Sequence, residues 1–169
     1  MARLSSRLLH TTHPRLESSA NSPRGPPVTL TNILASGTPP AVQVASITPA
    51  GIYLEDGLHL TGACIFLEGK VFLWDPPPSV SDWRREHMEV FEVAVPRPEI
   101  LILGTGADLA HPPPSINSYL TELGIQLDVM STRNACSTYN LLAEEGRRVA
   151  AALVPLTPRP WSRAAIKAP

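Results

Sequence analysis

Cysteines, long hydrophobic runs and clustered cations are all scarce in this sequence of 169 residues. Neither of its two cysteines, Cys64 and Cys136, belongs to a C-x-x-C pair, and the histidines do not follow metal-ligand spacing. We therefore expect neither a disulfide framework nor a zinc site, but two reduced and buried thiols. The longest apolar runs, such as residues 100–103, fall far short of the roughly eighteen residues that span a bilayer, so no transmembrane helix is predicted.

Proline, by contrast, is abundant. The 19 prolines cluster in segments such as 23–27, 76–78 and 112–114, and such clusters mark loops and tails. A hydrophobic content of 43% is enough for one core. We expect one folded domain over residues 45–158, preceded by a separate segment over residues 1–40 and followed by a flexible tail over residues 159–169.

The first residues, MARLSSRLLHTTHPRLESS, contain Arg3, Arg7 and Arg15 but no acid before Glu17. Positive charge at helical spacing, many serines and few acids are typical of a mitochondrial transit peptide, and a disordered basic tail is the alternative. A secretory signal would need a longer unbroken apolar run. The following NSPRGPPVTLTNILASGTPP resembles a flexible spacer.

Without residues 1–40 the chain keeps ten basic and fourteen acidic residues, a net charge of −4. An acidic domain without a stripe of lysine and arginine is a poor candidate for nucleic-acid binding.

The first half of the domain has a strand pattern. The stretches GIYLEDGLHL and ACIFLEGKVFLWD each place Glu-Asp-Gly or Glu-Gly between short apolar runs, which predicts two hairpins in an antiparallel meander. This meander is expected to join or cover one edge of a sheet. Residues 82–95 fit a helix with Ser81 as N-cap, although Phe91, Val93 and Val95 also alternate as in a strand.

The second half predicts strand–helix–strand–helix–strand. The strands are EILILG, IQLDVMS and RVAAALVPL, and the helices are PPPSINSYLTELG and STRNACSTYNLLAEEG. This order implies right-handed crossovers and a mainly parallel sheet, and thus an α/β fold.

The loop Gly104-Thr105-Gly106 follows a predicted parallel strand, where open α/β sheets bind ligands. The rest of a dinucleotide fingerprint is missing, because Leu109 stands where a third glycine belongs and no Gly-Lys-Ser/Thr follows. We therefore interpret the loop as a structural turn and expect no cofactor. The competing hypothesis is a small-ligand-binding domain or enzyme that uses this loop and Cys136.

Cys136 lies near the start of a predicted helix, where a thiol pKa can fall, and Asn134 or Thr132 could cap that helix. No histidine or acid lies within one turn to act as a base, so we expect Cys136 to pack the helix on the sheet. Trp74 and Trp83 flank a proline-rich loop. Two interpretations stay open for them: anchors of a protein interface, or side chains folded back on the core.

Two segments together resemble a known family. The first is EILILGTGAD, with Gly104, Thr105, Gly106 and Asp108, and the second is STRNACSTYNLLAEEGRRVAAALVPL, with Asn134-Ala135-Cys136 and Tyr139-Asn140. They are similar to a small α/β family formerly known only as a domain of unknown function. Its mitochondrial member is assembly factor 3 of NADH dehydrogenase, respiratory complex I. The resemblance covers about residues 47–158.

The resemblance implies a three-layer α/β domain with a mixed sheet, and a matrix protein peripheral to the inner membrane. It implies a non-enzymatic role in assembling the quinone-binding arm of complex I, with a second assembly factor and early subunits as partners. The family has no established catalytic residues, so none is assigned. The motif residues and the two tryptophans are candidate interaction residues.

Overall fold

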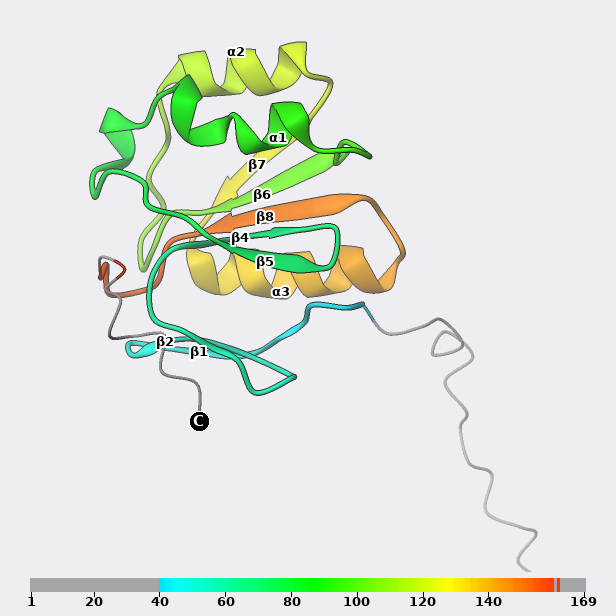
Figure 1. Ribbon diagram of the computed structural model, residues 1–169. Coiled ribbons are helices and arrows are strands. Elements are labelled where there is room, and N and C mark those ends of the chain that lie inside the picture. The colour runs from blue at the N-terminus through cyan, green and yellow to red at the C-terminus, as the bar shows by residue number, and fades with distance from the viewer. Residues whose placement is uncertain (1–39, 160, 162–169) are drawn as a thin grey trace, which may run out of the picture. The chain divides into compact units, whose positions relative to one another are not determined.

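Five strands form the central sheet of the computed structural model, which describes residues 40–159 and residue 161 (Figure 1). Their order across the sheet is β5 (Lys70–Leu73), β4 (Cys64–Leu67), β8 (Val149–Leu153), β6 (Ile100–Gly104) and β7 (Gln126–Met130). β8, β6 and β7 are parallel to one another, and β4 is antiparallel to both β5 and β8. The prediction of a mixed α/β sheet is confirmed. The predicted transit peptide and most of the predicted tail lie outside the described residues.

Helices cover both faces of this sheet. α1 (Val90–Val93) and α2 (Pro114–Glu122) lie on one face, and α3 (Thr132–Glu144) lies on the other (Figure 1). α2 has proline in its first turn and is followed by Gly124 with φ +77°, the left-handed conformation in which helices commonly end. The two helices predicted after the Gly-Thr-Gly loop are therefore confirmed.

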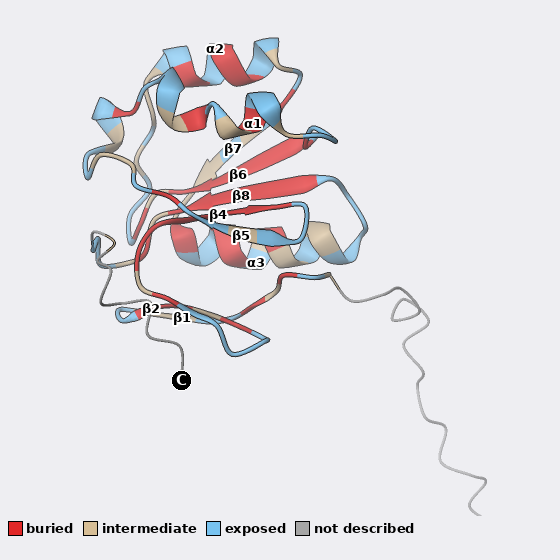
Figure 2. Cartoon of the chain, in the orientation of Figure 1, coloured by how far each residue is buried: buried red, intermediate tan, exposed pale blue. Residues whose placement is uncertain are grey.

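Every strand of the central sheet except the edge strand β5 supplies side chains to two separate cores. Along β6, Ile100 and Ile102 face the core beside α3, whereas Leu101 and Leu103 face the core beside α1 and α2. All five residues of β6 are buried, as are all five of β8, because both faces are covered (Figure 2). This explains why the sequences of these strands are continuously apolar instead of alternating.

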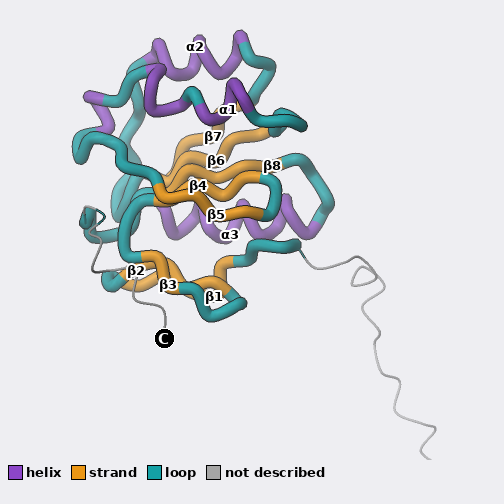
Figure 3. The backbone as a smooth tube through the Cα atoms, in the orientation of Figure 1, coloured by secondary structure: helices purple, strands orange, loops and turns teal. Residues whose placement is uncertain are grey.

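A second, three-stranded sheet packs beside α3. It consists of β1 (Val44–Thr48), β2 (Gly51–Leu54) and β3 (His59–Leu60), all antiparallel (Figure 3). The two hairpins predicted from the sequence both form, but they belong to different sheets: β2–β3 to the small sheet, and β4–β5 to the large one. The predicted single meander is therefore divided, and only its second hairpin extends the central sheet.

The predicted helix over residues 82–95 is wrong as one element. The structure has the short 3-10 helices η2 (Val80–Asp82) and η3 (Arg85–Met88) and then the single turn of α1. Ser81 lies within η2, and its hydroxyl contacts Ser79 at 2.7 Å instead of capping a helix. The break occurs at Trp83, which is extended at φ −68° and ψ 140° and donates its indole N–H to the Pro77 carbonyl at 2.8 Å. Burial of this indole thus overrides the helical pattern around it.

Candidate functional site

The Gly-Thr-Gly loop uses its own amides within the protein. The Thr105 N–H donates to the Met130 carbonyl at 3.1 Å, and the Gly106 N–H donates to the Thr132 hydroxyl at 2.8 Å. A phosphate-binding loop has to keep such N–H groups free for the anion. These two donors are already engaged, so the loop is built as a turn.

Thr132 closes the space at the carboxyl ends of β6 and β8. It is fully buried at the first position of α3, and besides accepting from Gly106 its hydroxyl donates to the Val154 carbonyl at 2.6 Å. The Thr132 N–H in turn donates to the Gly106 carbonyl at 2.8 Å. One side chain thereby joins the ends of two strands to the start of a helix, where a nucleotide enzyme would leave a crevice.

Gly104 is needed for this close approach. A Cβ at this position would lie 2.9 Å from both Leu153 Cδ2 and Thr132 Oγ1, which is closer than real side chains come. Gly106 has φ +108°, which other residues rarely adopt. The two glycines therefore have structural reasons that require no ligand.

The rest of the loop is held by Thr105. Its hydroxyl donates to the Asp108 carbonyl at 2.9 Å and accepts from the Ala110 N–H at 3.0 Å. The side chain of Asp108 is exposed. Among the loop residues of the family motif, Asp108 is thus the one that presents a charge to solvent.

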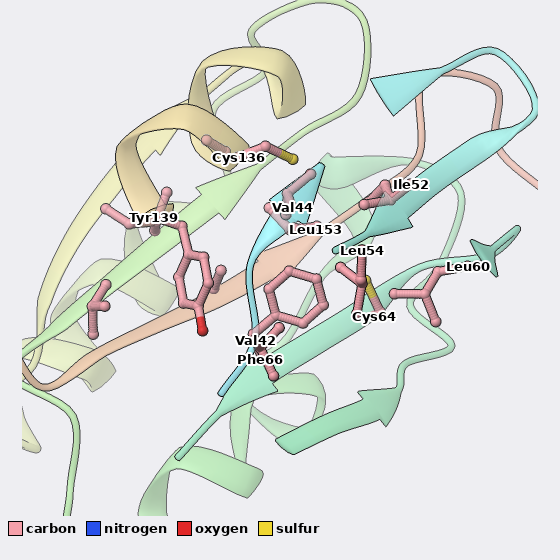
Figure 4. Packing of buried hydrophobic residues seen from close by; sticks show 14 of the residues in the cluster. Val42, Val44, Ile52, Leu54, Leu60, Cys64, Phe66, Cys136, Tyr139 and Leu153 are labelled. Atoms are coloured by element: carbon pink, nitrogen blue, oxygen red, sulfur yellow. The ribbon is translucent and has the colours of Figure 1, made fainter. Parts of the chain in front are cut away.

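The motif on α3 divides into an exposed and a buried part. Asn134 is exposed, whereas Ala135, Cys136 and Tyr139 are buried against the sheet (Figure 4). The Tyr139 ring lies 5.2 Å from the Phe66 ring, centroid to centroid. Neither Thr132 nor Asn134 is the N-cap residue of α3; that position is held by Ser131, which makes no side-chain capping bond.

The environment of the two cysteines opposes thiolate formation. Burial raises the pKa of Cys136 to about 12, against a small opposing effect of the Arg133 charge. Burial also raises the pKa of Cys64, with the nearby Cys136 adding to the effect. A thiol of raised pKa is a poor nucleophile, so Cys136 acts as a packing residue, as expected from the sequence.

The two candidate interface tryptophans lie in the core. Trp74 is 7% exposed and Trp83 is 2% exposed, and their rings meet edge to face with centroids 5.0 Å apart. The Trp74 indole N–H donates to the His87 carbonyl at 3.2 Å. Of the two interpretations left open by the sequence, the structure supports the second, in which both rings fold back on the core.

Two residues with long-range contacts were missed by sequence reasoning. Asn140 pairs its side-chain amide with both backbone groups of Val44, each at 2.9 Å, and so fastens the small sheet to α3. Trp161 contacts two carbonyls far away in the sequence. Asn140 had a signal in its place beside Tyr139 in the family motif, but its partner strand was not predictable.

Three surface pockets, of about 400, 280 and 280 Å³, are lined by residues other than Gly104–Gly106. Within residues 40–159 and 161, no three His, Cys, Asp or Glu side chains converge as a metal site would require. In the same part of the chain, no helix is both long and apolar enough to cross a bilayer.

Together, the layers and the filled turn define a small three-layer α/β domain. Its parallel strands β8, β6 and β7 are ordered as in nucleotide-binding folds, but Thr132 fills the place at the strand ends where such folds leave a crevice. The chain belongs to the family described as "Protein of unknown function (DUF498/DUF598)", whose sequence profile matches residues 44–154.

Curated relatives bear out the resemblance seen in the sequence. The chain is 34% identical over 124 residues to the Mus musculus protein named NADH dehydrogenase [ubiquinone] 1 alpha subcomplex assembly factor 3, covering 73% of this chain and 66% of the relative. The Xenopus tropicalis protein of the same name is 33% identical over 103 residues, covering 61% of this chain and 56% of the relative. The chain thus spans somewhat less than two thirds of the length of these relatives.

Solved structures share the fold. The Rpa2829 protein of Rhodopseudomonas palustris is 34% identical with a TM-score of 0.57, covering 69% of this chain and 84% of that one. A Bordetella pertussis protein described as a Mth938-like domain is 23% identical with a TM-score of 0.60, covering 72% of this chain and 90% of that one. The second likeness is one of fold alone.

Proposed function

We propose that this protein is a non-enzymatic assembly factor for mitochondrial respiratory complex I. In this role it binds early subunits of the quinone-binding arm together with a second assembly factor, in the matrix and at the periphery of the inner membrane. The observation that carries the proposal is the similarity to relatives named as complex I assembly factor 3 across most of the folded domain. The basic, acid-poor start of the sequence supports import into mitochondria.

The geometry of the Gly-Thr-Gly turn also supports a non-enzymatic role. The amides of Thr105 and Gly106 are engaged by protein acceptors, and Thr132 fills the position between the strand ends. The competing hypothesis needs free amides at this loop and a reactive Cys136. The raised pKa of Cys136 counts against it.

The assembly role acts through the surface of the domain. β5 is the edge of the central sheet, and its Phe72 and Leu73 are 40% and 54% exposed. An edge strand with exposed apolar side chains is a place where an extended segment of another protein can add to the sheet. We assign this edge as the candidate contact with an unfinished complex I subunit.

Deletion of the gene tests the proposal. Native gels of mitochondrial membranes from the deletion strain are expected to show less assembled complex I together with trapped subassemblies, while other respiratory complexes keep their levels. Reintroduction of the wild-type chain is the matched control and restores complex I. Normal complex I in the deletion strain would refute the role.

Affinity purification of the tagged chain from mitochondria tests the finer part of the proposal. Early quinone-arm subunits and a second assembly factor are expected in the purified fraction. Their absence, in a strain where deletion still lowers complex I, would restrict the proposal to an assembly role with other partners.

A further inference from the structure

Trp161 is held on the folded domain by two carbonyl groups. Its indole N–H donates to the Ala63 carbonyl at 2.6 Å and to the Trp74 carbonyl at 3.1 Å. The side chain is half-buried and packs against the core beside α3. Two acceptors from different positions in the sequence therefore converge on one N–H group.

Gly62 provides the space for this ring. A Cβ at Gly62 would lie 2.5 Å from Cε2 of the Trp161 indole and 2.8 Å from its Nε1. The φ angle of Gly62 is not positive, so the backbone conformation at this position does not itself require glycine. Glycine at this position is instead explained by the Trp161 ring, which occupies the space that a side chain would need.

The ring and its receptor come from different parts of the chain. Gly62, Ala63 and Trp74 lie within residues 44–154, which match the family profile, whereas Trp161 lies beyond them. In Figure 1 the red C-terminal part of the described chain lies at the edge of the molecule to which the arrows of β6 and β8 point. A segment outside the family match thus fills a notch that the family domain builds.

Space remains next to this notch. A pocket of about 280 Å³ is lined by Trp74, the three prolines 76–78 and, from the chain that leads to the tail, Pro155 and Pro158. Asp75 and Arg159 line the same pocket. Walls of proline and tryptophan suit an extended proline-containing segment, and Asp75 suits a cationic residue in it.

We propose that Gly62, Ala63 and Trp74 form an indole-binding notch whose ligands are tryptophan-bearing, proline-containing segments, and that Trp161 occupies it in the free chain. The tail sequence TPRPWSR, residues 157–163, has the matching chemistry: prolines, a tryptophan and an arginine two residues before it. A partner segment with the same chemistry displaces the tail, including the pocket residues Pro158 and Arg159, and then lies along the part of the pocket wall that stays in place, Trp74 and the prolines 76–78. This last step rests on the proposed role as an assembly factor, but the notch itself does not.

A peptide-binding experiment tests the notch with the full chain. The variant Trp161→Ala vacates the notch, and the heptapeptide TPRPWSR is titrated into it by calorimetry. We expect saturable binding to Trp161→Ala and at least about tenfold weaker binding to the wild-type chain, because the tethered indole competes at an effective concentration of roughly millimolar. The peptide TPRPASR, without the indole, is the matched control and is expected not to bind.

A second variant examines the receptor. Adding Gly62→Ala to Trp161→Ala places a methyl group where the ring would lie, so peptide binding is expected to fall at least about tenfold. Equal binding of TPRPWSR to the wild-type chain and to folded Trp161→Ala would overturn the proposal, and so would equal binding of the two peptides.

If Trp161→Ala does not fold, Trp161→Phe keeps a ring in the notch and removes only the N–H donor. The peptide is then expected to displace the phenyl ring, and no binding to folded Trp161→Phe would overturn the proposal. These measurements use purified protein, so they are independent of complex I levels. A deletion strain with normal complex I would refute the assembly role and leave the notch standing.

Discussion

At the scale of single residues, hydroxyl and thiol groups decide what the loop region can do. The Thr132 hydroxyl accepts the Gly106 N–H and donates to the Val154 carbonyl. Its side chain therefore fills the space at the ends of two parallel strands where a crevice could otherwise form. Cys136 and Cys64 are kept as neutral thiols by burial. Both features affect the free energy of unfolding, so both can be tested by denaturation experiments.

Substitution of Thr132 by valine keeps the shape of the side chain and removes its hydroxyl. The Gly106 N–H and the Val154 carbonyl then lose this partner inside the protein, which is expected to lower the free energy of unfolding by roughly 1–3 kcal/mol. Urea denaturation measures the change. Thr121→Val is the matched control, because that hydroxyl bonds to the Asn117 carbonyl on the exposed surface of α2, and it is expected to alter stability by less than about 0.5 kcal/mol.

The buried thiols predict a loss of stability in alkaline solution. Above about pH 8.5 the unfolded chain releases thiol protons that the folded chain retains, because the pKa of each thiol is raised on folding. The free energy of unfolding is therefore expected to be constant near neutral pH. Above about pH 8.5 it falls by up to roughly 1.4 kcal/mol per pH unit for each thiol.

Denaturant titrations between about pH 7 and pH 10 follow this loss of stability. Cys136→Ala removes one titrating group and is expected to reduce the alkaline slope by about half. A slope unchanged by this substitution would contradict the assignment of Cys136 as a buried neutral thiol.

At the scale of elements, β5 is the edge strand that we propose as the contact with a complex I subunit. Among the described strands it pairs only with β4, so its other side is free for a further strand. Its Phe72 and Leu73 are exposed, although large apolar side chains on an edge strand are usually covered by the protein itself or by a partner. The opposite edge strand, β7, has a more polar sequence, with Gln126 and Asp128. The two edges of the sheet therefore differ in what they offer to another protein.

Replacement of Leu73 by glutamate tests the β5 edge. Because Leu73 is more than half exposed, the change is expected to leave the melting temperature within a few degrees of wild type, while complex I in the complemented deletion strain falls severalfold. Leu141→Glu, at a similarly exposed position of α3, is the matched control. Equal effects of the two variants on complex I would argue against a specific role for the edge.

The success of sequence reasoning also varied by element. The second half of the fold was predictable, because the continuous apolar strands β6 and β8, the prolines that start α2 and the glycines after α2 and α3 each have a local cause. Residues 82–95 were not, because the indole bond from Trp83 to the Pro77 carbonyl is a tertiary contact that interrupts a helical pattern. The Gly-Thr-Gly loop was interpreted as a turn, and its engaged amides support this interpretation, but Thr132, which accepts one of those amides, was considered only as a helix cap. The notch for Trp161 had no local signal, since its carbonyl acceptors lie 98 and 87 residues away.

At the scale of the whole molecule, the described domain and the residues that precede it in the sequence differ in charge. The domain residues are acidic overall, whereas residues 1–40 contain four arginines and one acid. If residues 1–40 direct import, the radiolabelled full chain is expected to enter isolated energised mitochondria and to become shorter and protected from protease. A chain that starts at residue 41 is the control and is expected to stay outside, and equal import of both would contradict the transit-peptide interpretation.

The central sheet lies between two cores, and this arrangement limits which insertions into its strands the fold can accept. In β6, neighbouring side chains alternate between the α3 layer and the α1–α2 layer. Insertion of one residue within β6 would turn every later side chain of the strand to the opposite face of the sheet. An isoleucine that packs in the core with Tyr139 would then face the core with Tyr119, and a leucine would move in the opposite direction. The length of this strand is therefore far less free to vary than the amino acids that compose it.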